Sequence, residues 1–152
     1  MNPEIIERAE FSVLGITARI NPMEADYQDL WGNQFTPRQN EIFALAAEPG
    51  CYSFYFGTEQ EGLADFIAGV IVEQGTPAPE GLVVRAAPGG QYAVFACTMA
   101  TLSPTWGQIY AEWLPSSEYV EDESRPSYEY YAVDMGEGPD APLTIHVPIV
   151  AK

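Results

Sequence analysis

One carboxylate, Glu129, stands inside a run of tyrosines and is the side chain best placed to carry chemistry in this chain. It lies in the segment 126–131 (PSYEYY), downstream of a helix-like block, 106–115, whose aromatic residues fall on one face. Placing a charge among aromatic rings is costly unless a donor or a cation compensates it. Glu129 is therefore a candidate for binding a cation or for general-base catalysis.

The sequence leaves open the face of the strand on which Glu129 lies. Tyrosines occupy both sets of alternating positions in this segment, so strand periodicity does not distinguish a buried side chain from a solvated one. A solvated carboxylate on an edge strand is the ordinary alternative. If Glu129 is buried, desolvation raises its pKa unless a cation or a donor offsets the effect.

Aromatic side chains from other parts of the chain could form the walls of a site around Glu129. Their faces would attract a quaternary or protonated nitrogen. The alternative is a core role, because an aromatic stripe at helical spacing usually packs against a sheet. The candidates are Trp31, Tyr110, Trp113, Tyr52, Tyr55 and Phe66.

Metal sites and nucleophilic triads have little support. His146 is the only histidine, and neither Cys51 nor Cys97 belongs to a Cys-x-x-Cys or Cys/His pattern. No serine elbow accompanies the histidine. The acidic run 118–123 lacks the spacing of a calcium loop. We expect no metal and no cofactor.

Composition and charge limit the class of protein. The chain has 152 residues, 47% of them hydrophobic, so we expect a single domain over 1–152 with its own core. Its 22 acidic residues outnumber 6 basic ones, and the resulting net charge of -16 repels nucleic acid and attracts cations. Because a signal-peptide pattern and an apolar run of about 20 residues are both absent, we expect a soluble cytoplasmic protein without membrane association.

The order of predicted elements repeats between the two halves of the chain. In each half a strand is followed by a capped helix start, Asn21-Pro22 or Ser103-Pro104, and then by two more strands. A connector rich in proline and glycine, 73–90, separates the halves and contains a candidate short edge segment at 82–84. The predicted strands are 11–20, 51–56, 64–72, 91–99, 127–133 and 143–150.

This repetition predicts an α+β fold made of two strand-helix-strand-strand units, about 9–74 and 90–152. If the units pair about a pseudo-twofold axis, they form one antiparallel sheet with two main helices packed together on it. A cleft then lies between the halves. Such clefts are where small ligands usually bind, and we expect the ligand there.

Several segments of the second half resemble the GyrI-like small-molecule-binding domain, which is also the effector-binding domain of bacterial multidrug-responsive regulators. They are the strand 90–95 (GQYAVF), the helix ending at 113–115 (WLP), the strand 126–131 and the closing strand 145–149 (IHVPI). The resemblance spans nearly the whole chain. It implies that Glu129, at the glutamate position of the family's Phe/Tyr-Glu-x-Tyr strand, lies in the ligand pocket.

Two departures from the family pattern modify this expectation. Regulators of this kind carry a helix-turn-helix module before the domain, whereas this chain begins almost at once with its first predicted strand. It is therefore similar to the stand-alone members, and we expect no direct binding to nucleic acid. The segment 116–119 (SSEY) also stands where many relatives have a serine and a glycine, so we expect a differently shaped loop beside the pocket.

Three functions follow as hypotheses. In the first, the protein captures a lipophilic, aromatic and cationic ligand, with Glu129 as the charge complement. In the second, it is a hydrolase of small electrophilic compounds that uses Glu129 as general base. In the third, it is an acidic protein-interaction or inhibitor module with a protein partner. The substitution Glu129→Gln would weaken cation binding in the first case, abolish turnover in the second and change nothing in the third.

Overall fold

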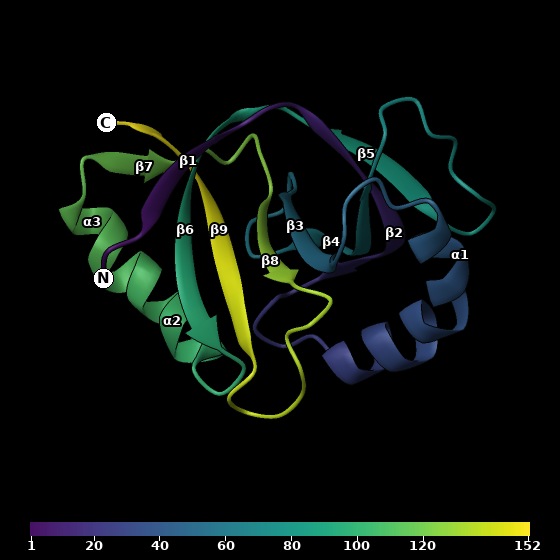
Figure 1. Ribbon diagram of the computed structural model, residues 1–152. Coiled ribbons are helices and arrows are strands. Elements are labelled where there is room, and N and C mark those ends of the chain that lie inside the picture. The colour runs from purple at the N-terminus through teal and green to yellow at the C-terminus, as the bar shows by residue number, and fades with distance from the viewer.

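The computed structural model describes residues 1–152, and its nine strands form one antiparallel sheet (Figure 1). The spatial order is β1-β6-β9-β8-β3-β4-β2-β5, and β7 pairs with β9. Together with two helical blocks, this sheet confirms the predicted antiparallel α+β architecture. The strands are β1 (Glu4–Arg8), β2 (Phe11–Ile20), β3 (Cys51–Gly57), β4 (Ala64–Val72), β5 (Val83–Ala87), β6 (Gly90–Thr98), β7 (Tyr119–Glu121), β8 (Ser127–Tyr131) and β9 (Pro142–Ala151).

The two halves of the sheet are arranged alike. In the first half β4 lies between β2 and β3, and in the second half β9 lies between β6 and β8. The halves meet where β3 pairs with β8. The outer strands are exchanged, because β1 pairs with β6 while β5 pairs with β2. β1 and β7 are not among the strands that the sequence predicts.

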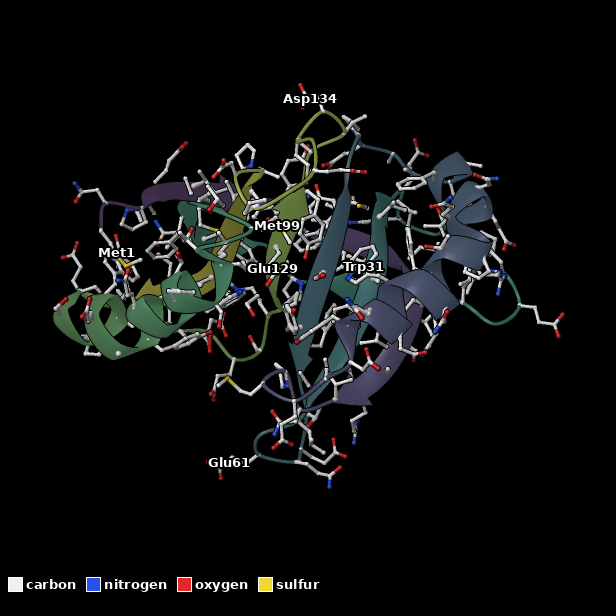
Figure 2. All side chains as sticks on the ribbon, turned by 90° about the horizontal axis from the view of Figure 1, so that it is seen from below. Met1, Trp31, Glu61, Met99, Glu129 and Asp134 are labelled. Atoms are coloured by element: carbon white, nitrogen blue, oxygen red, sulfur yellow. The ribbon has the colours of Figure 1, made fainter.

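Each helical block contains π-helical turns and packs on the strands of its own half. The first consists of η1 (Asp29–Phe35), η2 (Thr36–Arg38) and α1 (Gln39–Ala44) and contacts β2 and β4. The second consists of α2 (Leu102–Gln108), η3 (Ile109–Trp113) and α3 (Leu114–Ser116) and contacts β6 and β7. The sequence predicts two helices packed together, but the blocks lie on either side of the strand that carries Glu129 (Figure 2).

The first helical block begins later than its capping signal predicts. Asn21 Oδ1 accepts the backbone N–H of Met23, and the Tyr27 hydroxyl donates to the Pro22 carbonyl at 2.7 Å. These bonds hold 21–26 outside the helix, with a turn at 22–24, and Met23 is 92% exposed. The second block runs through Pro115 to Ser116, one residue beyond the predicted stop.

Apolar side chains pack on both faces of the sheet. One cluster lies under each helical block, and a third, rich in tyrosine and phenylalanine, lies on the opposite face. Between the two helix-side clusters, the sheet consists of β3 and β8. Ser53 and Glu129 form the central pair of this β3–β8 ladder. The sheet therefore places two polar side chains where the two halves meet.

Candidate functional site

Glu129 lies near the middle of the sheet, on the face that carries the helical blocks. Because β8 is paired on both edges, Glu129 is opposite Ser53 of β3 and opposite Ile145 of β9. The residue is only 5% exposed. Its neighbour Tyr128 points to the opposite face and belongs to the cluster there. Glu129 is thus a buried carboxylate on a central strand.

Neutral donors hold both carboxylate oxygens of Glu129. The indole N–H of Trp106, from α2, donates to Oε2 at 2.7 Å, and the Tyr131 hydroxyl donates to Oε1. Ser53 Oγ lies 2.9 Å from the Tyr131 hydroxyl oxygen, so the network extends to β3. No arginine, lysine or histidine forms an ion pair with Glu129.

Burial dominates the electrostatics of this network. Desolvation raises the pKa of Glu129 above its usual range, although hydrogen bonding by Tyr131, Trp106 and Tyr55 acts in the opposite direction. Desolvation and the nearby Glu129 charge also raise the pKa values of Tyr131 and Tyr55, so both hydroxyls remain protonated. The site combines an uncompensated carboxylate with neutral aromatic donors.

A cavity of about 680 Å³ lies next to this network, against the segment that connects β8 to β9. In its wall, Trp31 and Tyr131 meet edge to face with ring centroids 5.7 Å apart. Tyr131 therefore lines the cavity and binds Glu129, which is not itself part of the lining. The volume suits a small organic molecule. Other side chains that supply contact area are Cys51, Met99, Met135 and Pro139.

Three of the predicted aromatic candidates lie near Glu129 and its partners. Trp31 lines the cavity. Tyr110 is stacked on Trp106, with ring centroids 6.1 Å apart and planes 6° from parallel. Tyr55, which the sequence also indicates, meets Trp106 edge to face at 6.0 Å. These rings therefore pack against the residues that hydrogen-bond to Glu129.

The other predicted candidates pack in the core. Phe66 has no exposed surface and lies in the cluster under the first helical block. Trp113 packs on Phe95 with ring centroids 5.1 Å apart. Tyr52 lies on the opposite face of the sheet, because it is adjacent to Ser53 on β3 and strand positions alternate. None of the three contributes to the cavity wall.

Three members of the network, Trp106, Tyr131 and Ser53, are missing from the predicted set. For two of them, the spacing in the sequence indicates that they share a face with a predicted residue. Tyr131 follows Glu129 by two residues and so shares its face, and Trp106 precedes Tyr110 by four residues on one helix face. Ser53 carries no such signal, because only the register of β3 against β8 places it opposite Glu129.

His146 lies away from this site. On the opposite face its ring stacks on Tyr128 with centroids 4.4 Å apart, and burial lowers its pKa to about 3. The imidazole is therefore neutral and out of reach of Glu129. No three histidine, cysteine, aspartate or glutamate side chains are grouped so as to hold a metal ion. None of the helices has the length and apolar character that crossing a bilayer would require.

Known proteins share this sequence pattern and architecture. A family model described as the GyrI-like small molecule binding domain matches residues 1–150. The transcriptional regulator BrlR of Pseudomonas aeruginosa is 28% identical over 153 residues. The match covers 98% of this chain and 56% of BrlR, so the chain spans little more than half the length of that regulator.

Two solved structures extend the comparison. The structure of SAV2435 bound to tetraphenylphosphonium has a TM-score of 0.82 at 13% identity, and the match covers 99% of this chain and 94% of the other. A hydrolase from Listeria innocua has a TM-score of 0.59 at 11% identity, with 98% and 92% covered. At these identities the likeness establishes a common fold.

Proposed function

The chain belongs to the GyrI-like small molecule binding domain family, and we propose that it binds a lipophilic, aromatic cation in the cavity beside Glu129. The observation that carries the proposal is a buried carboxylate whose partners are neutral donors. No cation of the protein balances its charge. A ligand cation can therefore supply the missing counter-charge.

Tyr131 connects the cavity to the carboxylate. Its ring forms part of the cavity wall while its hydroxyl donates to Glu129. A cation placed against the rings of Trp31 and Tyr131 would gain about 0.5–2 kcal/mol from cation–π contact. It would also be attracted by the charge of Glu129, which is itself buried and is bound by the Tyr131 hydroxyl. Rotation of Tyr131 would allow the cation to approach Glu129 directly.

The complex of SAV2435 with tetraphenylphosphonium supports the class of ligand. Tetraphenylphosphonium is a monovalent cation covered by phenyl rings, so it combines the charge and the apolar surface that this cavity would recognise. The fold is the same, although the low sequence identity does not transfer individual contacts. We therefore propose the same class of ligand, a lipophilic cation, for this protein, without assigning its contacts from SAV2435.

Calorimetric titration with tetraphenylphosphonium and with neutral triphenylphosphine oxide tests the proposal. Glu129→Gln keeps the size and an acceptor oxygen but removes the charge. We expect the variant to bind the phosphonium at least tenfold more weakly, which corresponds to about 1.4 kcal/mol, and to bind the neutral compound within twofold of the wild type. Glu61→Gln, at an exposed position, has the same charge change and serves as the control.

Either of two outcomes would contradict cation binding at this site. One is an equal loss of phosphonium affinity in Glu61→Gln and Glu129→Gln, which would indicate attraction by the net negative charge alone. The other is phosphonium affinity unchanged by Glu129→Gln. Circular dichroism and thermal unfolding of each variant exclude loss of fold as the cause.

A hydrolase function is the second candidate, and one observation favours it. The raised pKa of Glu129 moves the carboxyl toward the range of a general base, and Tyr131 beside it could donate to a substrate oxygen. Both carboxylate oxygens already accept hydrogen bonds, so a reacting water would have to displace Trp106 or Tyr131. Mass-spectrometric detection of water addition to small strained electrophiles, lost in Glu129→Gln, would establish this reaction. If none of the electrophiles in the panel is hydrolysed, the hydrolase hypothesis is rejected and ligand binding remains the proposed function.

A further inference from the structure

A second aromatic–carboxylate pair repeats the arrangement at Glu129 one helical turn further along. Tyr110, four residues after Trp106, donates its hydroxyl to Glu121 Oε2 at 2.6 Å. Its ring is stacked parallel to that of Trp106. Two neighbouring aromatic residues of one helical block thus each hold a glutamate of the sheet.

The strand register places both glutamates on the same face. β7 and β8 pair with the same strand, β9, where Glu121 is opposite Ile149 and Glu129 is opposite Ile145. Residues four apart on a strand point to the same side and are about 13 Å apart. Both isoleucines lie in the cluster under the second helical block. The two carboxylates therefore form a row along this block.

Glu121, like Glu129, has no counter-ion. It takes part in none of the ion pairs of the protein, and Arg125, the nearest arginine in the sequence, is occupied by Asp122 and by the carbonyls of Gln91 and Ile149. Partial burial and the neighbouring Glu123 raise its pKa. Tyr110 is 43% exposed, so this pair lies at the surface end of the row.

We propose that Tyr110 and Glu121 form a second cation subsite, and that the best ligands carry two cationic centres joined by an apolar spacer. This inference rests on the proposed binding of a cation at Glu129. The first centre would occupy the site at Glu129, and the spacer would follow the stacked rings of Trp106 and Tyr110. The second centre would contact the Tyr110 face and Glu121.

The geometry also limits the length of the spacer. The backbone separation of the two glutamates is about 13 Å, so the two cationic centres must be separated by a comparable distance. A spacer that is too short leaves the second charge over apolar surface. The affinity should therefore rise with spacer length, reach a maximum and then fall.

A matched series of probes tests the second subsite directly. Each probe carries a triphenylphosphonium group joined by an alkyl chain to trimethylammonium, or to the neutral tert-butyl group of the same shape. We expect the dication of optimal length to bind the wild type at least tenfold more tightly than its tert-butyl analogue. In Glu121→Gln this advantage should fall below twofold, while affinity for the tert-butyl analogue stays unchanged.

Two further variants separate a specific subsite from general effects. Glu118→Gln removes one negative charge at a nearby exposed position and should keep the tenfold advantage. Tyr110→Ala removes the aromatic face of the second subsite, so it should reduce the advantage by about two- to fivefold. Equal losses in Glu118→Gln and Glu121→Gln, or an unchanged advantage in Glu121→Gln, would overturn the second subsite. If Glu129→Gln binds the tert-butyl analogues, which carry only the phosphonium charge, as tightly as the wild type does, the proposed function is refuted instead.

Discussion

The two halves of the protein share a scaffold and differ in chemistry. In the ladder that joins them, Ser53 of the first half is directly opposite Glu129 of the second, at the central pair of that ladder. Each half also presents a tryptophan toward this region, but Trp31 lines the cavity while Trp106 binds the carboxylate. The repeated architecture creates the shared interface, and a single residue difference gives one side the charge.

The two halves contribute differently to the candidate site: the first contributes apolar contact surface, and the second contributes negative charge. The first helical block contributes Trp31 to the cavity wall, and the second contributes donors to two glutamates. Symmetry would place two carboxylates face to face across the central ladder. The serine avoids that repulsion and instead hydrogen-bonds to Tyr131.

The largest effect on stability should come from placing a glutamate in the first half at the position opposite Glu129. Ser53→Glu would place a second buried carboxylate opposite Glu129, at a position that is 1% exposed. We expect the free energy of unfolding to drop by about 3–5 kcal/mol, as for other uncompensated buried charges. Urea unfolding measures this change. Ser53→Ala, which removes only a hydrogen bond, should cost about 1 kcal/mol, and similar losses in the two variants would contradict the charge argument.

Replacing each of the two tryptophans, Trp106 and Trp31, by phenylalanine should have opposite effects on stability and on ligand binding. Trp106→Phe leaves Glu129 Oε2 without its donor and should cost about 2–3 kcal/mol of stability. Trp31→Phe keeps an aromatic ring in the cavity wall and should cost about 1 kcal/mol or less. The Trp31 variant should nevertheless bind tetraphenylphosphonium about two- to fivefold more weakly, because phenylalanine offers a poorer cation–π face. Equal stability losses in the two variants would remove the distinction between the halves.

The smallest effect concerns pH and isolates the charge of Glu129. Its pKa is raised by desolvation, so between the usual glutamate pKa and the raised value the folded state retains a proton that the unfolded state has released. This contribution to stability is therefore present at low pH and is lost as pH rises through that window. Glu129→Gln lacks it, so the stability of the variant relative to the wild type should increase with pH.

Unfolding in urea at a series of pH values measures this difference. Phosphonium affinity of the wild type should rise over the same window, because the ionised carboxylate is the form that attracts the cation. A constant stability difference between the wild type and Glu129→Gln across the window would mean that the pKa of Glu129 is not raised.

Much of the fold follows from local signals in the sequence. Runs rich in β-branched and other apolar residues mark β2 and β4, and capped helix starts mark the order of elements in each half. The short strands β1 and β7 escape prediction because their stability depends on partners far along the chain. Their pairing with β6 and β9 is a property of the assembled sheet.

For the candidate site, the sequence singles out Glu129 and only some of the residues around it. A carboxylate among tyrosines is visible in one stretch of sequence, whereas its partners come from β3 and α2 and depend on strand register and helix rotation. Periodicity selects aromatic residues that face inward without distinguishing a core position from a cavity wall. For that reason Trp31 and Phe66 were equivalent candidates, although one lines the cavity and the other is fully buried.

The exchange of outer strands between the halves has a consequence for how the chain folds. β1 precedes β2 in the chain but pairs Glu4 with Val94 and Arg8 with Gly90, across most of the first half. Contacts of such large sequence separation require loop closure before they contribute energy, and they slow folding. During synthesis β1 has no partner until β6 has left the ribosome. The strands β3, β4, β2 and β5 of the first half can pair before β6 emerges, whereas the docking of β1 is expected to be a late step.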